Sequence, residues 1–360
     1  MSHASGTTHV RKQPAHNRPK LSMRATIALL AIACTVPATK ARAQEAVPRI
    51  HEQDSTRNNL VTPQRIRTVP LGTLGAVVRR GTGPQTMLLI PGLGFGASVF
   101  DPLMRALADS FTMVAVTLPG FDGTAPPPTP PAGTSYGAQT WTLGAQRAIE
   151  DLVSREDLRD IVVVGHWLTG TQLALRLRAA LPDRVRAVVL LAGSARFAGP
   201  RAMTAEQRVE FVDGPFSQGW FRTVTRETWD DNNFLPSDYA ADPVLGLRLW
   251  RQAARPDLHV WIRYLLEYHA SDIRTEHGAT RTPVLLLHPG LEGAWREPTG
   301  DYLTAFTRAG WGDLAGTGIE ARTIPGARLV PWVDQLAPVV TEIRRFSGAS
   351  PGVADRRPGQ

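Results

Sequence analysis

Short apolar runs alternate with segments of helical periodicity through the middle of the chain. Uninterrupted apolar runs at Met87–Ile90, Ile161–Val164 and Val284–Leu287 are typical of strands that are buried on both faces of a parallel sheet. Further strands are expected at residues 66–70, 75–80, Thr112–Thr117, Ala187–Leu191 and Glu320–Ile324. Helices are expected at Val99–Ala108, Trp141–Ser154, Thr171–Ala180, Asp301–Ala309 and Trp332–Arg345. This alternation predicts an α/β domain with a doubly wound, mostly parallel sheet over residues 66–346.

Two regions interrupt the alternation. Residues 125–137 form a proline-rich loop, and residues 195–281 carry many aromatic side chains but no convincing strand. The second region predicts a helical cap inserted over one end of the sheet, with most of its rings in the core of the cap itself. The last residues, 347–360, are rich in Pro, Gly and Arg, which is typical of a disordered tail.

The first 43 residues have the pattern of a leader. From Met23 a cationic start, the apolar run Ala25–Ala38 and the triplet Ala41-Arg42-Ala43 match a secretory signal peptide cleaved after Ala43. We expect translation to start at Met23, export of Sec type to the periplasm or the medium, and a linker at residues 44–65. A short membrane anchor and a lipoprotein acylated at Cys34 are the alternatives.

The distribution of charge argues against nucleic-acid binding. The formal net charge is +8, but residues 1–43 hold seven basic residues and no acidic ones. The rest of the chain has 33 basic and 32 acidic residues, with no basic stretch that could follow a phosphate backbone. Cys34 is the single cysteine and no metal-ligand spacing occurs, so the sequence implies no metal and no cofactor. No apolar run after the leader is long enough to span a bilayer.

Four local motifs occur in one order along the chain. They are LLIPGLG at Leu88–Gly94, VTLPGFDGT at Val116–Thr124, VVGHWLTG at Val163–Gly170 and IPGARLVPW at Ile324–Trp332. Together they resemble the oxyanion turn, the following strand–turn, the nucleophile elbow and the histidine segment of the α/β-hydrolase fold, in its esterase- and lipase-like members. The resemblance covers residues 66–346 and implies hydrolysis of carboxylic esters by a serine, a histidine and an acid.

Two positions of that triad carry other residues. The nucleophile position is Trp167, whose indole has an N–H donor and no usable nucleophile. The histidine position is Leu329, and counting along the strand after Pro283 places Glu292 at the acid position. Ester hydrolysis by the triad is therefore predicted to be absent.

Other parts of the family's site are expected to persist. The backbone amides of Leu93 and Leu168, in a turn that includes Gly92 and Gly94, resemble an oxyanion-binding pair. With Trp167 at its floor, the pocket above them suits a small apolar or ester-like molecule, or is filled by the indole itself. His166 is expected to be a packed, hydrogen-bonded histidine.

Three hypotheses follow. The first is an exported, non-catalytic member of the fold that binds a small apolar ligand or a protein partner. The second is a hydrolase, lyase or isomerase without the triad, whose acid–base candidates are His288, His166, Asp122 and Glu292. The third is an esterase with an unrecognised serine or an activated water. The G-x-S-x-G matches around Ser135 and Ser350 lie in loops, outside the strand-to-helix context of a nucleophile. The sequence leaves the oligomeric state open.

Overall fold

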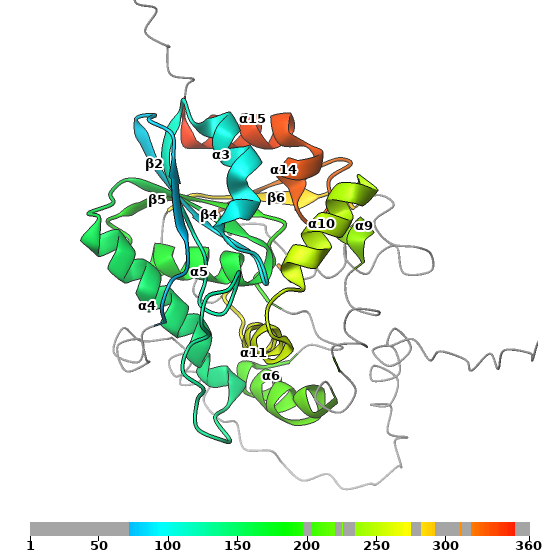
Figure 1. The fold of residues 1–360 in the computed structure, drawn as a ribbon. Coiled ribbons are helices and arrows are strands. Elements are labelled where there is room, and N and C mark those ends of the chain that lie inside the picture. The colour runs from blue at the N-terminus through cyan, green and yellow to red at the C-terminus, as the bar shows by residue number, and fades with distance from the viewer. Residues whose placement is uncertain are drawn as a thin grey trace, which may run out of the picture. The chain divides into compact units, whose positions relative to one another are not determined.

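The computed structural model describes residues 72–196, 203–219, 225, 235–274, 282–291, 310–311 and 318–349. All of them belong to one compact unit, Ala46–Gln360. In this part of the chain a seven-stranded sheet lies between layers of helices (Figure 1). The architecture is thus the mostly parallel, doubly wound α/β fold that the sequence predicts.

The sheet has the strand order β1-β3-β2-β4-β5-β6-β7. Only β1 runs antiparallel to its neighbour, and the other pairs are parallel. The strands are β1 (Val77–Arg80), β2 (Gln85–Ile90), β3 (Phe111–Val116), β4 (Ile161–His166), β5 (Val185–Leu191), β6 (Val284–Pro289) and β7 (Ile319–Ile324). Every residue of β4 is buried, because both faces of this central strand are covered by helices.

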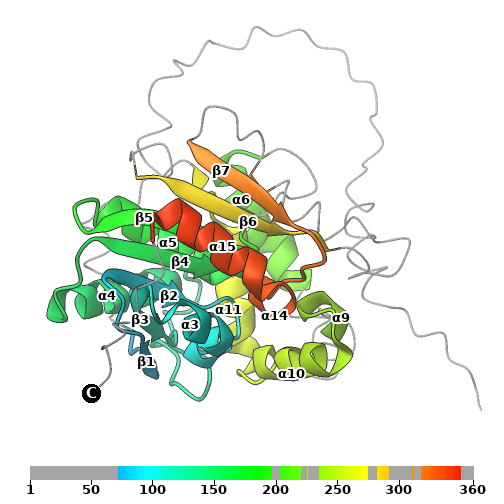
Figure 2. The same cartoon turned by 90° about the horizontal axis from the view of Figure 1, so that it is seen from above.

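Helices cover both faces of the sheet, as Figures 1 and 2 show. On one face lie α3 (Asp101–Leu107) and α15 (Leu336–Ser347), which contact each other. On the other face lie α4 (Thr140–Arg155) and α5 (Trp167–Ala180). Helix α5 begins directly after β4, so the turn between them holds its side chains at the carboxyl edge of the sheet, where ligands bind in open α/β folds.

Three predicted helices differ from the observed ones. The one expected at Val99–Ala108 is divided into the 3₁₀ turn η1 (Ala97–Phe100) and α3. The helix expected from Thr171 begins at Trp167, because strand β4 passes into α5 without an intervening loop. The single helix expected at Trp332–Arg345 is divided into α14 (Pro331–Asp334) and α15 at Gln335, whose φ and ψ are −134° and 58°. Pro338 explains the break, since a proline is accepted in the first turn of α15 but would lose a hydrogen bond inside a longer helix.

Helical segments make up most of the described part of residues 195–281. They are α6 (Ala205–Phe211), the π-helical turn η3 (Val212–Phe216), α9 (Pro236–Tyr239), α10 (Pro243–Ala253) and α11 (Leu258–His269). The described residues in this region include no strand beyond an isolated bridge between Arg196 and Asp272. The strand expected at 66–70 and the helix expected at Asp301–Ala309 lie outside the described residues.

Across the described ranges, no helix is both long and apolar enough to cross a membrane. Nor do the described histidine, cysteine and acidic side chains form a group of three or more that could hold a metal ion.

Candidate functional site

The turn between β4 and α5 has the geometry of a nucleophile elbow. Trp167 occupies its apex with φ of +50°, a left-handed conformation that a large side chain rarely adopts. Glycines allow the close approach around it. A Cβ added at Gly165 would lie 2.4 Å from the Gly170 carbonyl oxygen, and one at Gly92 would lie 2.9 Å from the Cβ of Trp167. The turn is therefore sharp and closely packed, and its apex carries an indole.

The indole of Trp167 is fully buried. Tyr239 from α9 and Trp261 from α11 meet it edge to face, at ring-centroid distances of 6.1 and 6.4 Å. Such pairs add roughly 0.5–1.5 kcal/mol each beyond the burial of area. Three aromatic side chains thus meet at the elbow, two of them from residues 195–281.

His166 connects the elbow to two other loops. Its Nδ1 accepts the Gly92 amide at 3.2 Å, so Nε2 carries the proton and donates to the Leu329 carbonyl at 2.8 Å. Burial lowers the pKa of His166 to about 4, with a smaller opposing effect of the Leu329 hydrogen bond. The ring is therefore neutral near pH 7 and holds the oxyanion turn, the elbow and the Leu329 loop together.

The Leu329 loop is fixed to helix α9. The amide of Leu329 donates to the Asp238 carbonyl at 2.9 Å, and that of Val330 donates to the Tyr239 carbonyl at 3.2 Å. Asp334 accepts the amides of Ala241 and Arg328, both at 2.8 Å, and burial raises the pKa of its carboxyl. These bonds join α9 and Ala241, which we call the cap segment, to the Leu329 loop.

The oxyanion turn is covered as well. Leu93 and Leu168 are fully buried, and Gly94 takes the left-handed φ of +87°. A Cβ on Gly94 would lie 2.4 Å from the carbonyl oxygen of Ala253, which also accepts the indole N–H of Trp261 at 3.1 Å. The junction between α10 and α11 therefore sits directly on the turn that would supply an oxyanion amide.

The order of the strands, the elbow geometry and the motifs agree with the result of a family comparison. The model of the α/β-hydrolase family matches residues 87–343, which is most of the chain. The chain belongs to the α/β-hydrolase family. In this member of the family Trp167 is the first residue of α5, and Leu329 lies in the loop that accepts a hydrogen bond from His166.

Curated relatives of the chain are hydrolases. A pimeloyl-[acyl-carrier protein] methyl ester esterase of Nitrosospira multiformis is 25% identical over 74% of this chain and 95% of its own length. A 2-(acetamidomethylene)succinate hydrolase of Mesorhizobium japonicum is 32% identical, but over 35% of this chain and 41% of its own length.

Solved structures show the same fold. The enol-lactonase from Burkholderia xenovorans LB400 aligns with a TM-score of 0.54 at 17% identity, over 75% of this chain and 95% of its own. A lipase-esterase related protein from Clostridium acetobutylicum aligns with a TM-score of 0.54 at 16% identity, over 76% of this chain and all of its own. At these identities the likeness extends to the architecture alone.

The remaining predicted residues are spread over other parts of this α/β-hydrolase domain. His288 is buried near the end of β6. Asp122 takes a φ of +47° and lies 3.7 Å from the guanidinium of Arg255. Glu292 lies outside the described residues.

Sequence reasoning missed the two rings that close the elbow. The sequence places Trp261, with most aromatic residues of 195–281, in the core of the cap, and it singles out no role for Tyr239. Both rings contact Trp167 across more than 70 residues of chain. The sequence signal was the concentration of aromatic residues in the cap, which does not reveal which ring faces the sheet. In the structure Tyr239 and Trp261 contact Trp167, whereas Tyr264, another aromatic residue of α11, contacts Phe121.

Proposed function

We propose that this α/β-hydrolase family member does not hydrolyse esters through a serine–histidine–acid triad, and that it binds a small apolar ligand at the elbow. The observation that carries the proposal is Trp167 at the strained elbow apex, supported by the hydrogen bond from the neighbouring His166 to the Leu329 carbonyl. Indole offers no nucleophile and leucine no proton acceptor, so acyl-enzyme formation and general-base catalysis both lack their group.

The ligand's chemistry follows from what lines the elbow. Three aromatic side chains surround the site, and the amides of Leu93 and Leu168 are the groups suited to a polar or anionic end of a ligand. A medium-chain acid or an aromatic ester combines such an end with an apolar body. Because Tyr239 and Trp261 close the site, entry requires the indole or the cap segment to move.

Export through a Sec-type signal is part of the same proposal. The apolar run after Met23 and the small residues at Ala41-Arg42-Ala43 support cleavage that leaves Gln44 at the amino terminus. Amino-terminal sequencing of the protein recovered outside the cytoplasm tests it. A start at any residue other than Gln44 would contradict the assigned cleavage site.

Turnover of p-nitrophenyl esters tests the loss of the triad. We expect the natural chain to be inert and the double variant Trp167→Ser/Leu329→His to gain hydrolysis, on the order of 10²-fold over the natural chain, because a base beside a nucleophile typically contributes that much. The single variants are the matched controls, since each restores one partner only. Turnover by the natural chain well above background would show that another group acts as nucleophile.

Ligand binding is tested by tryptophan fluorescence. Titration with decanoic acid or phenyl acetate is expected to change the emission of the natural protein, and Trp167→Phe is expected to remove part of that change. Trp250→Phe, a partly exposed indole on α10, is the control and should leave the change intact. A response that is equal in all three proteins, or absent from the natural one, would contradict binding at the elbow.

A further inference from the structure

A second site lies away from the elbow, between the proline-rich loop and the cap. A cavity of about 400 Å³ is lined by loop residues 129–136, by Asp213 and Ser217, and by His259 and Arg263 of α11. We call it the outer cavity. Its volume falls within the roughly 300–1,000 Å³ of small-molecule sites. Trp167 does not line it, so the inference below is independent of the function proposed above.

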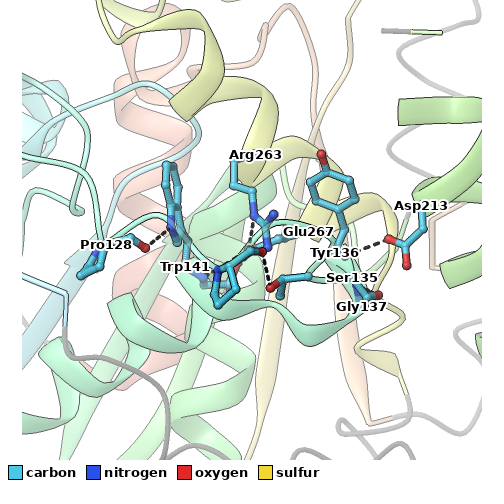
Figure 3. A network of polar contacts seen from close by, with 11 residues as sticks. Pro128, Ser135, Tyr136, Gly137, Trp141, Asp213, Arg263 and Glu267 are labelled. Atoms are coloured by element: carbon cyan, nitrogen blue, oxygen red, sulfur yellow. Dashed lines mark hydrogen bonds and ion pairs between the residues drawn. The ribbon is translucent and has the colours of Figure 1, made fainter. Parts of the chain in front are cut away.

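Hydrogen bonds fix the part of the outer cavity that α11 and the start of α4 form. Figure 3 shows the polar network beneath it, in which Glu267 accepts the Arg263 Nε–H at 2.8 Å and the amides of Trp141 and Thr142 at 3.2 and 2.9 Å. The guanidinium of Arg263 lies 4.6 Å from the ring centroid of Tyr136. A preformed site loses little conformational entropy when it binds a ligand.

The outer cavity offers both donors and acceptors. The Nη2 atom of Arg263 is buried and has no hydrogen-bond partner among the described residues. Asp213 accepts the Tyr136 amide through Oδ1 at 2.8 Å, and no hydrogen bond to its Oδ2 occurs in the described part of the chain. Ser135 accepts the Gly137 amide, so its hydroxyl proton is available, whereas Ser217 donates to the Asp213 carbonyl and can accept.

The charges favour a neutral ligand. Arg263 forms its ion pair with the buried carboxylate of Glu267 at 2.8 Å, and Asp213 is a further acid on the described wall. An anion would meet the carboxylates of Asp213 and Glu267, and a cation would meet the guanidinium of Arg263. Rings of Tyr136, Trp141 and His259 and the prolines of the loop supply apolar faces between the polar groups.

We propose that the outer cavity binds a neutral sugar, as a mono- or disaccharide unit. Each sugar hydroxyl both donates and accepts, which matches the mixed set around Arg263, Asp213, Ser135 and Ser217, and the C–H face of a pyranose packs against ring side chains. Ser135, His259 and Asp213 line one cavity, but no hydrogen bond joins any two of these side chains in the described structure. The proposal is therefore one of binding.

Isothermal titration of the full chain with cellobiose, maltose and N,N′-diacetylchitobiose tests the proposal. At least one is expected to bind with millimolar or tighter affinity, and Asp213→Asn is expected to weaken it about tenfold, as loss of one good polar contact does. Asparagine keeps an oxygen for the Tyr136 amide, so the fold should persist. His259→Ala, at an exposed position in the cavity wall, should weaken binding too.

Asp242→Asn is the matched control, because it makes the same chemical change at the exposed N-cap of α10, where asparagine caps equally well. Three results would overturn the proposal: no heat with any of the three sugars at millimolar concentration, affinity unchanged in both cavity variants, or tighter binding of 4-hydroxybenzoate than of every sugar. The last would identify an anion site instead.

Discussion

Helix α11 contacts two regions of opposite chemistry. On one side Trp261 meets the elbow, where Trp167 and Tyr239 complete a dry cluster of rings. On the other side a row of polar residues spaced four apart, His259, Arg263 and Glu267, faces helix α4 and the outer cavity. Ring packing and backbone hydrogen bonds stabilise the elbow. The outer region, by which we mean the outer cavity and the network of Glu267, is stabilised by the buried carboxylate of Glu267, which accepts from a guanidinium and from backbone amides.

The comparison separates the backbone form of the elbow from the side chains that line it. The elbow retains its positive φ and its close glycine contacts, yet its interior has the composition of a hydrophobic core. The groups that could recognise a polar molecule lie across α11 instead. In a scaffold of this kind, function is argued from the side chains that each position carries and not from the fold.

The largest expected effect concerns the outer region. Glu267 is fully buried and accepts the amides of Trp141 and Thr142, the Thr142 hydroxyl and the Arg263 Nε–H. Glu267→Ala leaves a mostly buried guanidinium and the first amides of α4 without this acceptor. We expect a loss of about 3–5 kcal/mol in the free energy of unfolding, measured by urea denaturation.

Glu210→Ala is the control for that variant, because Glu210 is an exposed residue of α6 and its removal should change the free energy by no more than about 0.5 kcal/mol. A loss below about 1 kcal/mol for Glu267→Ala would mean that the network contributes little. The outer region would then not depend on the buried charge of Glu267, and the difference drawn between it and the elbow would be wrong.

The sheet could be predicted from the sequence because its strands carry their own signal. Runs such as Ile161–Val164 are apolar at every position, and the observed β4 extends that run by only two residues. Helix ends were less predictable. The start of α5 at Trp167 depends on a turn that only the folded elbow stabilises, and the break at Gln335 depends on reading Pro338 as a residue of a first turn.

Only those residues of the candidate site that lie within the sequence motifs could be predicted. They placed Trp167, His166 and Leu329 in one neighbourhood, and the hydrogen bonds of His166 join the corresponding loops. Tyr239 and Trp261 could not be found in this way, since contacts between distant segments leave no local pattern. The same holds for Glu267, whose partners Trp141 and Thr142 lie more than 120 residues away.

A second prediction concerns how the free energy of unfolding depends on pH in the two regions. Burial lowers the pKa of His166, at the elbow, and of His269, in α11, to about 4 each. Between pH 6.5, the ordinary histidine pKa, and pH 4, both histidines are protonated in the unfolded chain but neutral in the folded chain. The stability contributed by each neutral ring is thus present above pH 6.5 and is lost as the pH falls towards 4, by roughly 1.4 kcal/mol per pH unit.

His269→Phe separates the two contributions. Between pH 6.5 and 4 the slope of the unfolding free energy against pH should decrease by about 1.4 kcal/mol per pH unit, which corresponds to one proton. His166 is then the one of the two histidines that remains. Burial raises the pKa of the carboxyls of Asp334 and Glu150, which acts in the opposite sense, but both are present in the two proteins and cancel in the difference. An unchanged slope would show that His269 is protonated in the folded chain.

The smallest expected effect concerns the closure of the elbow. Asp334 accepts the amides of Ala241 and Arg328, and so fixes the Leu329 loop to the cap segment. Asp334→Ala should lower the free energy of unfolding by about 1–2 kcal/mol and speed hydrogen exchange at the Leu329 and Val330 amides. Asp109→Ala, which removes an ion pair to Arg344 at the surface, should cost less than about 1 kcal/mol and leave that exchange unchanged. If exchange at Leu329 and Val330 stays slow in Asp334→Ala, the aromatic rings alone close the elbow and the hydrogen bonds of this loop are secondary to them.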